Sequence, residues 1–319
     1  MIQGAAEINP DSREAGRQKI LDQVITDLSH PDSYREVYYR PEHGQPMPSV
    51  AALAEIMELL KAVLFPGYFG ESEVPRASIP YYLGSRVDKA YRLLGEQIRR
   101  GYCFLCDLKD QRECENCENM SWQVAGSFIS TLPRIRSYLA SDVKAAYWGD
   151  PAAKTLGEII FCYPSITALT HYRIAHELHG LGVDLIPRII TEMSHSSTGI
   201  DIHPGAEIGR YFFIDHGTGT VIGETSVIGE NVRLYQGVTL GGKTIPQDET
   251  GMAIKDVPRH PIVEDDVVIY SGATILGRVR IGRDSSIGGN VWITEDIPPG
   301  SKVLQKRGRS LSFSHGSGI

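Results

Sequence analysis

The fold is decided by residues 263–298, which read VEDDVV-IYSGAT-ILGRVR-IGRDSS-IGGNVW-ITEDIP, with an apolar residue opening each group of six. Four positions after each of these comes a small or β-branched residue. The same spacing begins earlier and resumes after a slip of two residues, at Ile202, Ile208 and Ile214 and then at Ile222, Ile228, Leu234 and Leu240. A six-residue repeat is typical of a parallel β-helix, in which three short strands make one triangular coil. The pattern therefore predicts a solenoid of about four coils; the alternative is an ordinary β-sandwich with chance spacing.

Composition limits the classes of function. A chain of 319 residues is long enough for two domains with separate cores. The net charge of −7, with acidic and basic residues well mixed, argues against nucleic-acid and membrane-surface partners. No stretch approaches the roughly 18 apolar residues of a membrane span, and residues 1–10 lack the pattern of a secretory signal. We expect a cytoplasmic protein.

Before the repeat, apolar residues recur at helical spacing. The spacing predicts helices over 16–29, 49–64, 79–100, 129–147, 154–161, 165–179 and 183–193. The fold class is therefore α+β, an all-helical N-terminal domain followed by a parallel β-helix. We expect a mobile N-terminus at 1–15, a helical domain at 16–198, the β-helix at 199–300 and a C-terminal tail at 301–319. Cys162, alone in an apolar run, is expected in the core.

Four cysteines crowd into residues 103–117, as two Cys-x-x-Cys pairs: Cys103 with Cys106, and Cys114 with Cys117. Paired knuckles of this kind place four thiolates around one ion. Zinc is the expected occupant and an iron–sulfur cluster the alternative, because thiolate number alone does not separate them. Four protein ligands leave no open position, so the metal would be structural. The alternative is four free or redox-active cysteines in a helical hairpin.

The solenoid pattern is interrupted at Asp215-His216-Gly217-Thr218-Gly219, where the frame slips, and again by a long excursion over 243–259. With about eighteen residues per coil, Asp201 would lie beneath position 219, one rung below His216. Because stacked strands are about 4.8 Å apart, the carboxylate would reach the imidazole. An Asp–His pair makes a general base for a hydroxyl or amine nucleophile. The alternative is a structural histidine.

Several motifs resemble the serine O-acetyltransferase family: Asp-Ile-His-Pro (201–204), Ile-Asp-His-Gly-Thr-Gly (214–219), Ile-Gly-Glu-Thr (222–225), Gln-Gly-Val-Thr-Leu-Gly-Gly (236–242), Arg-His-Pro (259–261) and Tyr-Arg-Ile-Ala-His (172–176). The resemblance is dense over residues 146–299. It implies a left-handed β-helix that transfers acetyl from acetyl-CoA to the L-serine hydroxyl, giving O-acetylserine for cysteine biosynthesis. It also implies direct attack without an acyl-enzyme, and a homotrimer or a dimer of trimers.

The resemblance also implies roles for single residues. His216 would be the base and Asp201 its orienting partner. Carried over in the same way are the ammonium ligands Asp150 and Asp215, the carboxylate ligands Arg259 and His260, and the coenzyme A lining Gly242, Ser271 and Gly289. Asp150 could instead cap a helix before Pro151. For His203 and Glu224 we expect structural hydrogen bonds near the site.

Two features depart from the family pattern and one extends it. The family has a Gly-Ala-Gly-Ala run where this chain reads Tyr270-Ser-Gly-Ala, and the 243–259 loop is longer than the family's short glycine-rich loop. The C-terminal Ile319 resembles the tail that these enzymes insert into O-acetylserine sulfhydrylase. Three other functions remain open: acetyl transfer to another hydroxyl (a sugar or homoserine), a metal-dependent hydratase like the γ-carbonic anhydrases, and a non-catalytic scaffold.

Overall fold

The computed structural model describes residues 10–39, 46–71, 73–105, 111–244, 246–255 and 257–305. Contacts divide the chain into two units, 1–44 and 45–319. In the first unit, α1 (Pro10–Ser29) is followed by the single turn α2 (Pro31–Tyr34). The helix thus begins six residues before the predicted start, with a proline, which suits a first turn. The apolar residues whose spacing predicted this helix are exposed, between 41% and 68% at Ile20, Leu21, Val24, Ile25 and Leu28.

The helices of the second unit are α3 (Val50–Leu64), the short η1 (Arg76–Ser78), α4 (Ile79–Leu105), α5 (Gln111–Gly149), α6 (Leu156–Cys162), α7 (Pro164–Gly180) and α8 (Ile186–Thr198). Each predicted helix is present. Ser49 caps α3 by accepting the Ala52 N–H at 3.2 Å. Helix α8 ends at Thr198, the last residue of the predicted helical domain, and its C-cap is Gly199, with φ +70°. Cys162 is exposed, so its predicted core position is wrong: of the seven residues of α6, only Ile159 is buried.

No helix in the described part of the chain is both long and apolar enough to span a membrane.

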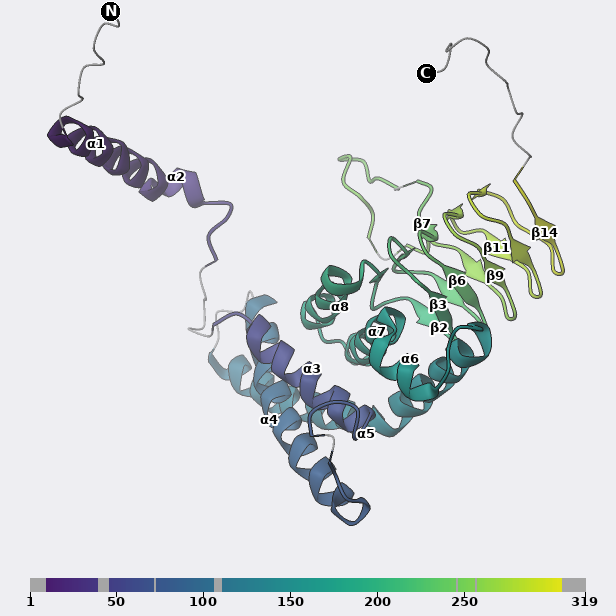
Figure 1. Ribbon diagram of the computed structural model, residues 1–319. Helices are drawn as coiled ribbons and strands as arrows, with labels where there is room; N and C mark the ends of the chain where they lie inside the picture. The colour runs from purple at the N-terminus through teal and green to yellow at the C-terminus, as the bar shows by residue number, and fades with distance from the viewer. Residues whose placement is uncertain are drawn as a thin grey trace, which may run out of the picture. The chain divides into compact units, whose positions relative to one another are not determined.

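The predicted solenoid is confirmed as three parallel sheets (Figure 1). Face 1 holds β1 (Asp201–Ile202), β4 (Val221–Ile222), β7 (Thr239–Gly241), β10 (Thr274–Leu276) and β13 (Trp292–Ile293). Face 2 holds β2 (Glu207–Ile208), β5 (Val227–Ile228), β8 (Ile262–Val263) and β11 (Arg280–Ile281). Face 3 holds β3 (Phe213–Asp215), β6 (Arg233–Tyr235), β9 (Val268–Ile269), β12 (Ser286–Ile287) and β14 (Lys302–Val303).

The repeated apolar residues fill the prism as predicted. From Ile202 to Ile293 they stack on one another and are at most 7% exposed. The solenoid has about five turns rather than the predicted four, because β13 and β14 add a further turn. The prolines at 298 and 299 lie at a corner, and Lys302 pairs with Ser286 beyond them.

The first coil is longer than the second. Asp201 pairs with Val221, a step of 20 residues, whereas Val221 pairs with Thr239, a step of 18. The predicted register, which put Asp201 beneath position 219, is therefore wrong by the two residues inserted at the corner. Those residues lie around the paired glycines Gly217 and Gly219, both with positive φ.

A buried ion pair joins the helices to the solenoid. Arg173 on α7 pairs with Asp142 on α5, 2.9 Å from Nε to Oδ2, and the two side chains are 6% and 0% exposed. Arg173 also donates to the carbonyls of Ile208 (2.9 Å) and Gly209 (2.7 Å), and Asp142 accepts the Phe212 N–H at 3.1 Å. Together these bonds satisfy both charges, so the helices and the first coil share one core.

Candidate active site

The corner between face 3 and face 1, residues 215–219, carries the predicted base and is called the His216 corner. His216 and Gly217 both take positive φ, +59° and +90°. A Cβ on Gly217 would lie 2.4 Å from Ile200 Cδ1, so this position requires glycine. The turn projects the His216 side chain outward, where it is 74% exposed. An imidazole so placed can meet a substrate, but the single chain does not shield it from water.

Two carboxylates lie near this imidazole. Asp215 is 13% exposed, with Oδ1 3.8 Å from His216 Nε2 and Oδ2 3.1 Å from Arg233 Nη2. Asp150, just after α5, accepts the Tyr163 hydroxyl at 2.6 Å and the Ala152 N–H at 2.8 Å. The hydrogen bond from Tyr163 is the main cause that holds the pKa of Asp150 below its usual value; the Ala152 N–H and then the charges of Arg233 and His216 act in the same direction. Asp150 is therefore both a local cap, through Ala152, and a charged group beside His216.

The structure does not form the predicted contact between Asp201 and His216. Asp201 opens β1 and is half-buried. Among the described residues no hydrogen bond or ion pair joins it to His216, whose ion pair is with Asp215. The cause is the 20-residue first coil, which shifts Asp201 by two positions relative to the predicted register.

The corner between face 1 and face 2 is called the His260 corner; it comprises Glu224, Thr225, Arg259 and His260. The His260 ring is 7% exposed and lies so close to Gly223 that a Cβ there would be 2.1 Å from His260 Cδ2. The Thr225 hydroxyl accepts the N–H groups of Arg259 (2.9 Å) and His260 (3.1 Å). The Thr225 hydroxyl and the Thr225 N–H in turn donate hydrogen bonds to His260 Nδ1, at 2.9 and 3.1 Å. This places the ring proton on Nε2.

The charged groups around His260 are also held in place. Arg259 Nη2 donates to Glu224 Oε2 at 2.7 Å. Burial and the neighbouring Arg259 lower the pKa of His260, so the ring is a neutral hydrogen-bond donor at pH 7. His203 accepts the Gly205 N–H at 3.0 Å, a structural hydrogen bond of the kind expected for it. Burial, reinforced by Arg188, lowers the pKa of His203 to about 4.

The two corners lie at opposite edges of face 1. Thr220 to Thr225 is five residue steps, which is at most about 16 Å for an extended chain at about 3.3 Å per residue. The predicted site residues divide between these corners: Asp150, Asp215 and His216 at one, Arg259 and His260 at the other. The predicted coenzyme lining divides in the same way. Ser271 and Gly289 stack at the His216 edge, where a Cβ on Gly289 would lie 3.0 Å from the Ser271 carbonyl, and Gly242 adjoins the Arg259 side chain. One chain therefore does not gather the predicted residues around one small substrate.

The cysteine cluster is only partly described. Cys103 is buried near the end of α4, and Cys117 is half-buried on α5, which packs against α4. Cys106 and the side chain of Cys114 lie outside the described residues, as does Ile319. Within the described residues, no group of three His, Cys, Asp or Glu side chains is arranged to hold a metal.

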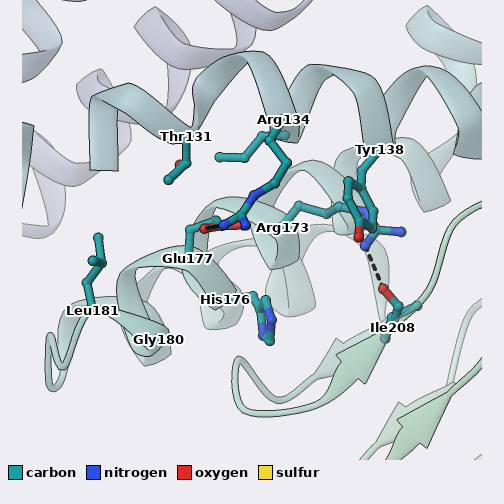
Figure 2. Close-up of a pocket in the computed structure, with 10 residues that line it drawn as sticks. Thr131, Arg134, Tyr138, Arg173, His176, Glu177, Gly180, Leu181 and Ile208 are labelled. Carbon is teal, nitrogen blue, oxygen red and sulfur yellow. Dashed lines mark hydrogen bonds and ion pairs between the residues drawn. The ribbon is translucent and has the colours of Figure 1, made fainter. Parts of the chain in front are cut away.

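A hollow of about 350 Å³ lies away from both corners, between α5, α7 and β2. Figure 2 shows two contacts among its lining residues: the ion pair of Arg134 with Glu177 and the hydrogen bond from Arg173 to the Ile208 carbonyl. None of the predicted site residues lines this hollow. Its walls belong to the junction between helices and solenoid, so we assign it no catalytic part.

Sequence reasoning missed three residues that hold the site: Tyr163, Thr225 and Arg233. Thr225 fell within a quoted motif, and its place at a coil corner beside Glu224 was the available signal. Arg233 lies one rung above Phe213, which is two residues before Asp215, so a correct register would have pointed to it. Tyr163 reaches Asp150 only because α6 folds back after α5. No local sequence pattern predicts this contact between Tyr163 and Asp150.

The solenoid and its two polar corners define the class of the protein, a hexapeptide-repeat transferase. A model of the family described as bacterial transferase hexapeptide (six repeats) matches residues 260–295. Similar proteins of known family narrow this class to one kind of transferase. The plasmid serine acetyltransferase of Synechococcus elongatus is 48% identical over 97% of this chain and 98% of its own length. The chain belongs to the serine acetyltransferase family.

Solved structures agree with this assignment. Serine acetyltransferase isoform 3 of Entamoeba histolytica, in complex with cysteine, superposes with a TM-score of 0.68 at 32% identity, covering 93% of this chain and 94% of the other. The serine acetyltransferase of Neisseria gonorrhoeae in complex with serine gives 0.51 at 26% identity, with coverage of 81% and 97%.

Proposed function

We propose that this protein transfers the acetyl group of acetyl-CoA to the hydroxyl of L-serine, giving O-acetylserine for cysteine biosynthesis. The proposal rests on one observation: a His–carboxylate corner and an Arg–His corner border the same face of a hexapeptide solenoid whose family is serine acetyltransferase. An amino acid needs an anionic group for its ammonium and a cationic one for its carboxylate, and the two corners supply both.

In this mechanism His216 accepts the proton of the serine hydroxyl as the oxygen attacks the acetyl carbonyl carbon. The carbon–sulfur bond then breaks, and the departing thiolate of coenzyme A takes the proton back from the imidazolium. Asp201 keeps the orienting role expected from the sequence, which requires the exposed His216 ring to turn toward face 1 when substrate binds. Arg259 and the Nε2–H of His260 receive the serine carboxylate.

The active site is completed by a second copy of the chain, in a trimer. His216 is 74% exposed in one chain, whereas general-base catalysis gains from a site closed to water. Because the two corners lie at opposite edges of face 1, we place the His216 corner of one copy against the His260 corner of the next. Acetyl-CoA would then lie between them, along Ser271 and Gly289 of one copy and Gly242 of the other.

The test is the serine-dependent loss of the acetyl-CoA thioester, compared between wild type and His216→Ala. We expect turnover with L-serine that falls by about 10²–10⁴-fold in the variant. His195→Ala is the matched control, because His195 lies on α8 and pairs with Glu192 at 3.2 Å. Thioester loss that prefers homoserine or a sugar over serine would contradict the assigned acceptor.

The four cysteines are proposed to hold one structural zinc. The buried Cys103 and half-buried Cys117 lie on packed helices that flank the connection at 106–110, as a two-knuckle site requires. Metal analysis of purified protein should give one zinc per chain, lost in Cys103→Ser. Iron with acid-labile sulfide would indicate a cluster instead, and no metal would contradict the proposal.

The C-terminal tail is proposed to bind O-acetylserine sulfhydrylase through Ile319. Deleting Ile319 should abolish co-migration of the two proteins in size-exclusion chromatography, and should leave serine acetylation unchanged. Co-migration that survives the deletion would contradict this role.

A further inference from the structure

A hollow of about 220 Å³ lies where the end of α5 meets face 3, and is called the Trp148 hollow. Its lining includes Trp148, Tyr211, Phe213, Arg233 and Asp266. The end of α5 approaches the sheet closely here, since a Cβ on Gly149 would lie 3.0 Å from Phe213 Cδ1. None of the described residues that the sequence predicted for the active site lines this hollow. Its volume is below the range of about 300–1,000 Å³ for drug-sized ligands, so it suits a single ring system.

Tyr211 has an unusual backbone conformation beside this hollow, with φ +58°. The strand register places Tyr211 in one column with Asn231, Asp266 and Asp284 of the following coils, whose φ values are +56°, +60° and +59°. Asn and Asp tolerate the left-handed region, whereas a bulky aromatic residue is an outlier there. Strain of this kind concentrates at functional sites and ligand clamps. The surroundings of Tyr211 are therefore a candidate binding site.

The hollow also has an aromatic lining. The rings of Trp148 and Tyr211 are stacked, with centroids 6.0 Å apart and planes at 18°. The stack does not bury the indole, which is 69% exposed, whereas Phe213 is 2% exposed. Flat apolar surfaces of this kind suit a planar ring, which can stack on them.

Two polar groups of the hollow have unused hydrogen-bonding capacity among the described residues. Arg233 Nε is buried without a hydrogen-bond partner, while Nη2 of the same side chain lies 3.1 Å from Asp215 Oδ2. Asp266 Oδ1 accepts the Asn231 side-chain N–H at 2.6 Å, which leaves Oδ2 for another donor. A buried N–H without an acceptor is costly, so a ligand that supplies an acceptor gains affinity. Because an anionic ligand would meet the charges of Asp215 and Asp266, an uncharged ligand fits better.

We propose that the Trp148 hollow binds a purine base, at a site separate from that of the coenzyme. The base stacks against the aromatic rings, accepts the Arg233 Nε–H on a ring nitrogen and donates its amino group to Asp266. An adenine edge carries such an acceptor and donor side by side, and nucleic-acid bases stack on aromatic side chains. Because the same guanidinium holds Asp215, a bound base also affects the serine reaction. That regulatory part rests on the proposed serine acetyltransferase activity, whereas base binding does not.

Calorimetric titration of the full chain with adenosine tests the site. We expect a Kd at or below about 1 mM for wild type. Trp148→Leu should weaken binding by about 5- to 100-fold, the range for loss of one base–aromatic contact. Trp292→Leu is the matched control, because Trp292 on β13 is similarly exposed, at 68%, and does not line the hollow.

The polar contacts are tested with purine riboside, which is adenosine without its amino group. It should bind wild type about 10-fold more weakly than adenosine, or weaker still, because it lacks one hydrogen bond to a charged group. Asp266→Asn should reduce this difference to below about 3-fold. Asp284→Asn, at the equivalent position of the next coil, should preserve the difference.

Tyr211→Asn separates a ligand role from a structural one. Asn suits the left-handed region, so the midpoint of thermal unfolding should stay equal or rise, while adenosine binding weakens by about 5-fold or more. A lower midpoint with unchanged adenosine binding would show that Tyr211 serves packing, and would contradict its part in the site.

Competition distinguishes this site from that of the coenzyme. Saturating coenzyme A should leave adenosine binding unchanged. Displacement of adenosine would mean that the hollow receives the coenzyme's own adenine, and would overturn the separate site. Absence of adenosine binding to wild type, or binding that Trp148→Leu does not weaken, would overturn the proposal as a whole.

Kinetics test the regulatory part. Saturating adenosine should change the KM for serine by about 5-fold or more in wild type, and should leave it unchanged in Trp148→Leu. Equal KM values with and without adenosine, in wild type that binds it, would contradict the regulation. Protein that binds adenosine yet shows no serine-dependent thioester loss would contradict the proposed function and leave the base site standing.

Discussion

The two corners of face 1 hold their histidines in opposite ways. At the His260 corner the ring is 7% exposed, both of its Nδ1 contacts come from Thr225, and it packs on Gly223. At the His216 corner the side chain is 74% exposed, and its ion pair with Asp215 is long, at 3.8 Å. A group that only binds can be fixed in advance, whereas one that must collect and release a proton has to be accessible. The solenoid places a fixed histidine, His260, and an accessible one, His216, at the two edges of the same sheet.

The largest expected effect comes from disrupting the packing of the His260 corner. Gly223→Ala would place a methyl group 2.1 Å from His260 Cδ2, so the buried ring must move. We expect a loss of about 3 kcal/mol in the free energy of unfolding, the upper range for overpacking, together with loss of serine binding. Chemical denaturation measures the first and calorimetry the second.

Gly242→Ala is the stability control at the same corner, because a Cβ there meets Arg259 carbons only at 3.7 Å or more. Equal stability of the two alanine variants would show that the packing of His260 on Gly223 is not tight.

A smaller effect should follow from removing one hydroxyl. Thr225→Val keeps the side-chain volume but leaves the N–H groups of Arg259 and His260 without their acceptor. The cost should be about 2 kcal/mol of unfolding free energy, as for buried unsatisfied donors. Thermal and urea unfolding check it. A variant as stable as wild type would mean that water replaces the hydroxyl and that the corner is looser than its contacts indicate.

The stability of the protein should also depend on pH through His203, a neighbour of the His260 corner. Its folded pKa is lowered to about 4 by burial, below the unfolded value of about 6.5. Between these values the unfolded chain binds more protons, so this group's contribution to stability is complete above about pH 6.5 and declines as the pH falls toward 4. The melting temperature of His203→Gln should therefore fall less steeply over this range. Parallel curves for the two proteins would contradict the assignment.

The smallest effect on stability is expected at the His216 corner. His216→Ala should leave the unfolding free energy within about 0.5 kcal/mol of wild type, the usual range for exposed positions, although it removes the proposed base. A destabilisation of about 2 kcal/mol or more would show that His216 is a structural residue.

The sequence predicted the solenoid well because its signal is local: every sixth residue must enter the prism, and these residues are buried from Ile202 to Ile293. It also located both corners, through a frame slip and a long loop. It failed on the partner of Asp201, because a two-residue insertion changes the register of one coil. It could not find the contact of Tyr163 with Asp150, since that depends on how α6 packs after α5. Long-range polar contacts carry no periodic signal.

The most direct test of the central claim, that each active site joins the His216 corner of one copy to the His260 corner of another, is a mixing experiment. His216→Ala and Arg259→Ala chains, each inactive alone, are unfolded together at equal amounts and refolded, and serine-dependent thioester loss is measured. Random mixing should restore about one quarter of wild-type activity, because about one quarter of the interfaces then carry both corners intact. No recovery, in oligomers shown by differential tags to contain both chains, would contradict the shared site.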